Sequence, residues 1–210
     1  MLTYRAVTAL SFGARSVAMA ALLLTCVACA SGDSGEPPTP REQPSTPVGA
    51  CKVVTQSFMV PSARHVADCS ALPETSSPPA GGDHYGTWAA FQNYSFPIPH
   101  GFLIHAMEHG AVVVYYNCPD GCENEVAEVQ AWLDAQPEDP LCVGEPTLRR
   151  AVLTPDPTLE VRWAMSAWGE TLRANCFDSQ AFSSFYDAHY GHGLEPFCTA
   201  GVAFDAPPCE

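Results

Sequence analysis

The residues best suited to chemistry lie in one string, His105-Ala-Met-Glu108-His109. On a helix, histidines four positions apart share one face, so that both imidazoles can reach one metal ion. Glu108 lies beside them and can serve as a ligand, as an acceptor that orients an imidazole, or as a base. The pattern His-x-x-Glu-His is the inverted form of the zinc-protease helix. We therefore predict a transition-metal site for zinc or copper, since histidine suits both ions. The alternative is a helix end with exposed imidazoles and no metal.

Two histidines do not complete a metal site, and His84 is the strongest candidate for a third. It lies in a glycine-rich loop, where glycine lets the backbone approach closely. His100 is a weaker alternative, and Met107 should face away from the histidine pair. The predicted ligand set is His84, His105, Glu108 and His109. Three other histidines have no local pattern and are expected on the surface: His65, His189 and His192.

The same residues leave an enzymatic alternative open. A zinc ion with a free coordination position could activate water, with Glu108 as the general base of a hydrolase. No pattern marks a further acidic ligand, and Glu160 and Glu170 are candidates without a motif. A nucleophile elbow, a phosphate-binding loop and a dinucleotide fingerprint are not found. We favour metal binding or handling and leave open whether the protein is an enzyme.

Cys118-Pro-Asp-Gly-Cys122 is a second candidate for chemistry. It precedes a predicted helix, whose dipole lowers the pKa of a nearby thiol. The pair could therefore be redox-active, which would make this a thiol–disulfide protein, or it could bind copper. A short structural disulfide is the favoured interpretation, because the chain is rich in cysteine.

The remaining cysteines predict a disulfide framework. The chain has ten cysteines; one, Cys26, falls within a predicted signal, and another, Cys29, is its predicted lipidation site. The other eight are an even number and suit an oxidising compartment. They are Cys51, Cys69, Cys118, Cys122, Cys142, Cys176, Cys198 and Cys209. We expect pairs that are local in sequence: Cys51–Cys69, Cys118–Cys122 and Cys198–Cys209, with Cys142–Cys176 remaining.

The N-terminus has the pattern of an export signal. Arg5 and Arg15 precede an apolar run at residues 17–24, which is shorter than the about 20 residues that span a bilayer. Small residues then lead to Cys29, and this resembles a bacterial lipobox, with Cys26 as the second choice. We predict a lipoprotein signal at residues 1–29 and an exported protein, lipid-anchored to a bacterial membrane and facing the periplasm or cell exterior. A plain cleaved signal peptide is the alternative.

Composition divides the rest of the chain into a tether and one domain. Residues 30–49 are rich in proline and serine and suit a partly extended tether. Residues 50–210 are long enough for one domain with its own core. Removal of Arg5 and Arg15 with the signal leaves seven basic against 23 acidic residues, a formal charge of −16. Such a surface repels nucleic acid and tolerates cations.

Periodicity predicts the elements of the domain. Strands are expected at residues 52–60, 111–116 and 149–154, and a hairpin with arms at 161–168 and 170–175. The run at 111–116 is apolar throughout, which is typical of a strand buried on both faces. Helices are expected at 101–109, ended by Gly110, at 123–135, and at 178–190, capped by Asp178.

The order of these elements predicts the fold class. From residue 111 it runs strand, helix, strand, strand, strand, helix. This indicates an α/β or α+β domain with a small mixed sheet, two to three helices and stabilising disulfides. A thioredoxin-like fold has a core of this kind.

Several strings together resemble a known family. Residues 78–88, Pro-Pro-Ala-Gly-Gly-Asp-His-Tyr-Gly-Thr-Trp, are similar to a Pro-Pro-Thr-Ser-Gly-Pro-His-Tyr-x-x-Trp stretch. Residues 105–114 are similar to His-x-Leu-Glu-His-Gly-x-Val, and Ser166-Ala-Trp-Gly169 with the following Asp-x-x-x-Phe helix completes the order. The chain from about residue 50 to 195 thereby resembles the bacterial family called domain of unknown function 3105, many of whose members are secreted or membrane-anchored.

The resemblance supports the choice of site residues without assigning an activity. It implies that His84, His105, Glu108 and His109 belong to the motifs that characterise the family. Here Ala-Gly-Gly-Asp replaces Thr-Ser-Gly-Pro before His84, and Met107 replaces a leucine. Cys118 and Cys122 are not part of the family pattern, so they are not expected to form a shared active centre.

Overall fold

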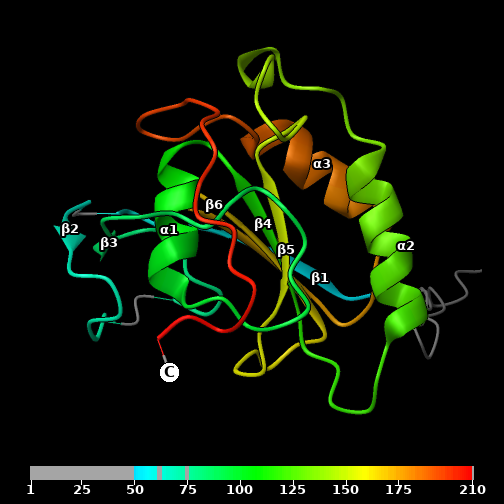
Figure 1. Ribbon diagram of the computed structural model, residues 1–210. Helices are drawn as coiled ribbons and strands as arrows, with labels where there is room; N and C mark the ends of the chain where they lie inside the picture. The colour runs from blue at the N-terminus through cyan, green and yellow to red at the C-terminus, as the bar shows by residue number, and fades with distance from the viewer. Residues whose placement is uncertain (1–49, 61–62, 74–75, 210) are drawn as a thin grey trace, which may run out of the picture. The chain divides into compact units, whose positions relative to one another are not determined.

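The computed structural model describes residues 50–60, 63–73 and 76–209 (Figure 1). The predicted signal at residues 1–29, with Cys26 and Cys29, and the predicted tether at 30–49 lie outside the described residues and stay predictions. Within the described part of the chain, no helix is long and apolar enough to cross a bilayer.

A five-stranded mixed sheet forms the centre of the domain, with the strand order β1-β7-β6-β4-β5. Strands β4 and β5 are parallel and are connected through a helix, whereas every other neighbouring pair is antiparallel. The strands are β1 (Val53–Ser57), β4 (Val112–Tyr116), β5 (Ala151–Pro155), β6 (Trp163–Ala167) and β7 (Glu170–Ala174).

The apolar run of β4 explains why both faces of this strand are buried. Side chains alternate between the faces of a strand, so Val113 and Tyr115 pack in one core cluster while Val112 and Val114 pack in the other. All four are fully buried. Other elements must therefore cover both faces of this strand, which lies between β6 and β5 in the sheet.

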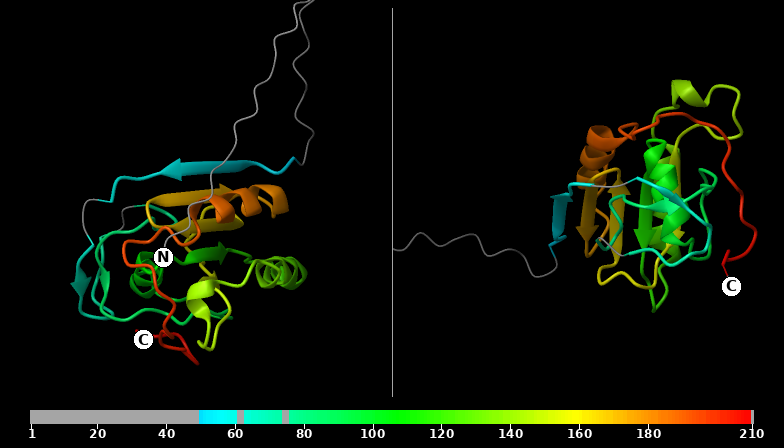
Figure 2. Two further views of the ribbon diagram at one scale, coloured as in Figure 1. Left: turned by 90° about the horizontal axis from the view of Figure 1, so that it is seen from above. Right: turned by 90° about the vertical axis from the view of Figure 1, so that its left-hand side faces the viewer.

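Helices cover the two faces of the sheet (Figures 1 and 2). Helix α1 (His100–Glu108) packs on one face. Helices α2 (Glu123–Asp134) and α3 (Ser179–His189) pack on the other. A short ladder of β2 (His65–Val66) and β3 (His84–Tyr85) lies against α1, and a 3-10 turn, η1 (Pro140–Cys142), follows α2. The predicted α+β class with a mixed sheet is confirmed, whereas the thioredoxin-like topology stays a prediction.

Four disulfides brace the domain, and three of the four pairings expected from sequence are wrong. Only Cys118–Cys122 pairs as expected. The other bonds are Cys51–Cys176, Cys69–Cys209 and Cys142–Cys198. Sheet register explains the first of these, because Val53 lies opposite Ala174 in the antiparallel pair β1–β7 and brings the flanking cysteines together. Proximity in space, not in sequence, therefore sets the connectivity.

Loop length separates the short disulfide from the three long ones. The long bonds join residues 125, 140 and 56 positions apart, and the short one joins residues only four apart. By the loop-closure entropy of the unfolded chain, each long bond contributes about 4 to 5 kcal/mol, and the short one about 2 kcal/mol. The fold therefore depends least on Cys118–Cys122.

We expect the predicted cap of α3 to contribute measurably to stability. The Asp178 carboxylate accepts hydrogen bonds from the backbone N–H groups of Gln180 and Ala181. Asp178→Ala should lower the free energy of unfolding by about 1 kcal/mol, measured by urea denaturation. Asp187→Ala, an exposed position on the same helix, is the matched control. An equal loss in both variants would contradict a specific capping role.

Candidate metal centre

The β2–β3 ladder places two histidines side by side. These strands are parallel, and His65 is the register partner of His84. The His84 side chain is fully buried, whereas the His65 side chain is 54% exposed. One imidazole therefore lies inside the domain and the other at its surface, next to the first.

Helix α1 contributes two more polar side chains to the same place. His105 and Glu108 lie three positions apart and therefore project from one face of the helix, and both are buried. The helix approaches β3 closely because Gly101 faces the Tyr85 ring, where an added Cβ would lie only 2.5 Å from a ring carbon. A small residue at Gly101 thus sets the distance between the helix and the ladder.

The four side chains form a compact group, here called the His3Glu cluster: His65, His84, His105 and Glu108. One ligand atom from each lies within 4.8 Å of the others. Glu108 Oε2 is 3.1 Å from His84 Nε2 and 3.6 Å from His65 Nε2. Two ligands that bind a tetrahedral zinc at roughly 2.0–2.1 Å are separated by about 3.3–3.4 Å. These two separations lie on either side of that value, and the other ligand atoms lie within 4.8 Å of one another.

Backbone carbonyls fix the orientation of the two buried rings. His84 Nδ1 lies 2.8 Å from the Gly82 oxygen, and His105 Nδ1 lies 2.7 Å from the Tyr85 oxygen. A carbonyl only accepts hydrogen bonds, so each Nδ1 donates its proton there and Nε2 is left with its lone pair. Histidines that bind metals are usually held in this way.

The contact between His84 and Glu108 calls for a positive charge. The His84 ring donates its Nδ1 proton to the Gly82 carbonyl. Its Nε2 lone pair therefore lies 3.1 Å from a Glu108 carboxylate oxygen, and both atoms are electron-rich. A proton between the two atoms, carried by the ring or by the carboxyl group, or a metal ion bound by both makes this contact favourable. The cluster therefore has the electrostatics of a cation site.

Burial keeps His105 neutral. Loss of solvent around its ring lowers the pKa of His105 from 6.5 to about 4, against the raising effect of its bond to the Tyr85 carbonyl. The neighbouring histidines lower it further. A neutral imidazole is the form that binds a metal, so at neutral pH His105 is ready to act as a ligand.

The structure brings together three of the four predicted ligands and adds one that sequence reasoning missed. His84, His105 and Glu108 belong to the cluster, together with His65. His65 had been expected only on the surface, since no motif surrounds it. Its position depends on pairing between two strands of two residues each, which leave no detectable pattern in a sequence.

The fourth predicted ligand, His109, lies beside the cluster but not in it. Its ring is 4.6 Å from that of His105 and packs against Trp88 and Phe197. Its Nδ1 donates to the Glu195 carbonyl at 3.0 Å. Its Nε2 is buried and has no hydrogen-bond partner among the described residues. A role for His109 as a ligand stays a prediction.

Other predicted positions lie away from the cluster. His100 is at the opposite end of α1, with Nε2 2.9 Å from an Asp156 carboxylate oxygen. Met107 is fully buried in the core, consistent with its expected direction. His192 is exposed. His189 is partly exposed, and its ring packs against that of Phe185.

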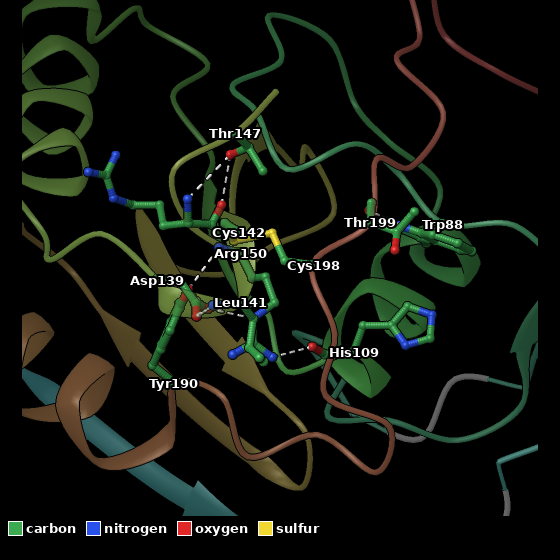
Figure 3. Close-up of a disulfide and its surroundings, with 11 residues drawn as sticks. Trp88, His109, Asp139, Leu141, Cys142, Thr147, Arg150, Tyr190, Cys198 and Thr199 are labelled. Atoms are coloured by element: carbon green, nitrogen blue, oxygen red, sulfur yellow. Dashed lines mark hydrogen bonds and ion pairs between the residues drawn. A yellow bond between two sulfur atoms is a disulfide. The ribbon is translucent and has the colours of Figure 1, made fainter. Parts of the chain in front are cut away.

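A buried ion pair anchors the end of α1 that carries the cluster (Figure 3). Arg150 donates from Nη1 to the His109 carbonyl at 2.6 Å and from Nε to the Asp139 carboxylate at 2.8 Å. Burial raises the pKa of Asp139, but hydrogen bonds from Tyr190, Leu141 and Arg150 outweigh it and lower that pKa overall. The carboxylate therefore stays ionised and holds the arginine in place. The Cys142–Cys198 disulfide lies beside this pair.

Comparison with known proteins places the chain in a family. A family profile described as "Protein of unknown function (DUF3105)" matches residues 65–200. The chain belongs to this family. The matched segment includes every residue of the His3Glu cluster, beginning with His65. No curated protein and no solved structure matched the chain.

We expect the metal-free protein to lose stability in mildly acidic solution. The pKa of His105 is lower in the folded state than in the unfolded chain, so the unfolded state gains a proton first as the pH falls. Stability should decrease from about pH 6.5 to about pH 4, by on the order of 3 kcal/mol. Urea unfolding at several pH values in a chelator would measure this.

A matched variant tests whether His105 causes this decrease in stability with falling pH. His105→Gln removes the titrating ring and should give a shallower decrease over the same pH range. A wild-type unfolding free energy that does not change between these pH values would contradict the proposed neutral His105.

Proposed function

We propose that this protein is an exported, lipid-anchored protein that binds a transition-metal ion at His65, His84, His105 and Glu108. The observation that carries the proposal is the convergence of four ligand atoms within 4.8 Å. The carbonyl-fixed Nδ1 atoms of His84 and His105 support it, because they leave each Nε2 free to bind.

The ligand types favour zinc or divalent copper. The cluster offers imidazole nitrogens and a carboxylate oxygen, which suit both ions. Monovalent copper prefers thiolates and thioethers. Met107 is packed in the core, and the eight cysteines of the described domain are in disulfides. We therefore assign the site to an ion that accepts nitrogen and oxygen ligands.

Charge supports the same proposal. Glu108 is 5% exposed, and the partners of its carboxylate in the cluster are the imidazoles of His65 and His84. A buried carboxylate is costly unless a cation or hydrogen bonds compensate it. A bound divalent ion supplies that charge, and the acidic chain, with formal net charge −14, favours the approach of cations.

Exposure gives the ion a route into the cluster. His65 is the only one of the four residues that faces solvent, so it can release and rebind an ion while the other three stay in place. This arrangement suits a protein that takes up and hands over metal. The lipid anchor is proposed from the N-terminal sequence pattern, and the four disulfides fit an exported domain.

Single alanine variants should separate the ligands by affinity. We expect wild type to bind about one zinc ion per chain and His84→Ala or His105→Ala to lose most of the affinity. His65→Ala should weaken binding less, by about 10- to 100-fold, because its ring is exposed and water can take its place as a ligand. Isothermal titration with zinc, and separately with divalent copper, measures these constants.

Two further variants complete this comparison. His192→Ala, an exposed histidine outside the cluster, should bind as wild type does. His109→Ala tests whether the neighbouring ring also contributes. Unchanged affinity in folded His84→Ala and His105→Ala proteins would refute the site.

Glu108→Gln tests whether this carboxylate is a ligand or a catalytic base. Its oxygen lies within ligand–ligand distance of two imidazoles, so we propose a ligand role, and the variant should bind zinc more weakly. In the hydrolase alternative the variant would keep its zinc and lose turnover of ester or peptide substrates. Measuring zinc affinity and hydrolysis on the same sample distinguishes the two outcomes.

A further inference from the structure

The Cys118–Cys122 disulfide occupies a different region from the His3Glu cluster. It lies between the carboxyl end of β4 and the start of α2. Glu108 lies before β4 and Cys118 after it, so the five residues of the strand separate them by about 17 Å. The two features can therefore be tested independently.

The two sulfur-bearing residues differ in their exposure. Cys122 is buried, at 9% exposure, whereas Cys118 is half-buried and is followed by the exposed residues Pro119, Asp120 and Gly121. An incoming group can therefore approach Cys118 more readily than Cys122. Because access differs between the two sulfur atoms, an incoming thiolate attacks the Cys118 sulfur in preference to the Cys122 sulfur.

The start of α2 favours Cys122 as the leaving group. Cys122 is the N-cap residue of this 12-residue helix, and no side chain caps the first turn. The first backbone N–H groups of a helix lack partners within it. Together with the helix dipole, they stabilise a thiolate formed at the cap, and the proposal requires this effect to outweigh the repulsion from Glu123 and Glu125 in the first turn.

We propose that Cys118–Cys122 is a thiol–disulfide exchange site whose co-reactant is an external thiol. The attacking thiolate forms a bond to the Cys118 sulfur while the bond between the two cysteines breaks, and the electron pair leaves on Cys122. A second external thiolate then attacks the mixed disulfide and releases Cys118. Two external thiols are oxidised to one disulfide, and the protein disulfide is reduced to two thiols.

Nearby charges indicate which thiols react best. Asp120 and Glu123 are exposed beside the disulfide, whereas the Glu125 carboxylate is paired with Arg162 at 2.6 and 2.8 Å. The net local charge is negative, so it repels anionic thiols and attracts cationic ones. Cationic cysteamine should therefore react faster than anionic glutathione.

Rates at two disulfides in the same folded protein test the proposal. Cys69 and Cys209 are both exposed, so exposure alone predicts that their bond is reduced first. The helix cap instead predicts that Cys118–Cys122 reacts about three- to tenfold faster. Full-length protein would be treated with cysteamine or with glutathione, quenched by alkylation and mapped by mass spectrometry, with circular dichroism to verify that it stays folded.

Three variants test which cysteine is attacked and how the nearby charge affects the rate. Cys122→Ala should leave Cys118 free to form a stable mixed disulfide. Asp120→Asn should increase the rate with glutathione by about twofold, because one repulsive charge is removed. Asp134→Asn, at the other end of α2 and about 17 Å away, should change nothing.

Two outcomes would overturn the proposal. One is reduction of Cys118–Cys122 no faster than that of Cys69–Cys209. The other is reduction of Cys118–Cys122 only together with loss of the folded signal. Either result would leave this bond as a structural link, without changing the proposed metal site.

Discussion

Burial of helix α1 beyond its first residue is the constraint on which the candidate site depends. Its residues from Gly101 to Glu108 are all buried, although the helix carries an imidazole and a carboxylate. Buried polar groups must find partners, and here they find backbone carbonyls and one another. The ladder β2–β3 supplies the Tyr85 carbonyl and two rings, and the C-terminal tail supplies the Glu195 carbonyl to His109. The surroundings of α1 are thus arranged around polar groups that solvent cannot reach.

Local patterns predicted the elements and part of the site. Hydrophobic spacing, the glycine after α1 and the Asp178 cap predict the strands of the main sheet and the three α-helices of the described residues. His105 and Glu108 were identified because helical spacing alone places them on one face. His84 was identified from its glycine-rich loop, and the structure brings it within bonding distance of Glu108.

Long-range geometry could not be predicted in the same way. His65 joins the cluster through a ladder of only two residue pairs, and no periodicity marks so short a strand. The pairing of Cys51 with Cys176 follows from the register of β1 on β7, and a count of cysteines carries no information about register. The missed ligand and the wrong disulfide pairings have one cause. Residues far apart in the chain come together only through strand pairing, which local patterns do not predict.

The long disulfides determine the order in which synthesis and oxidation of the domain can occur. Cys69–Cys209 ties the segment just after His65 to the last described residue, and Cys51–Cys176 joins the first strand to the end of β7. Neither bond can close until the chain has been synthesised as far as its second cysteine, which is residue 209 in one bond and residue 176 in the other. Both bonds therefore form only after every residue of the His3Glu cluster has been made, in whichever compartment oxidises the chain.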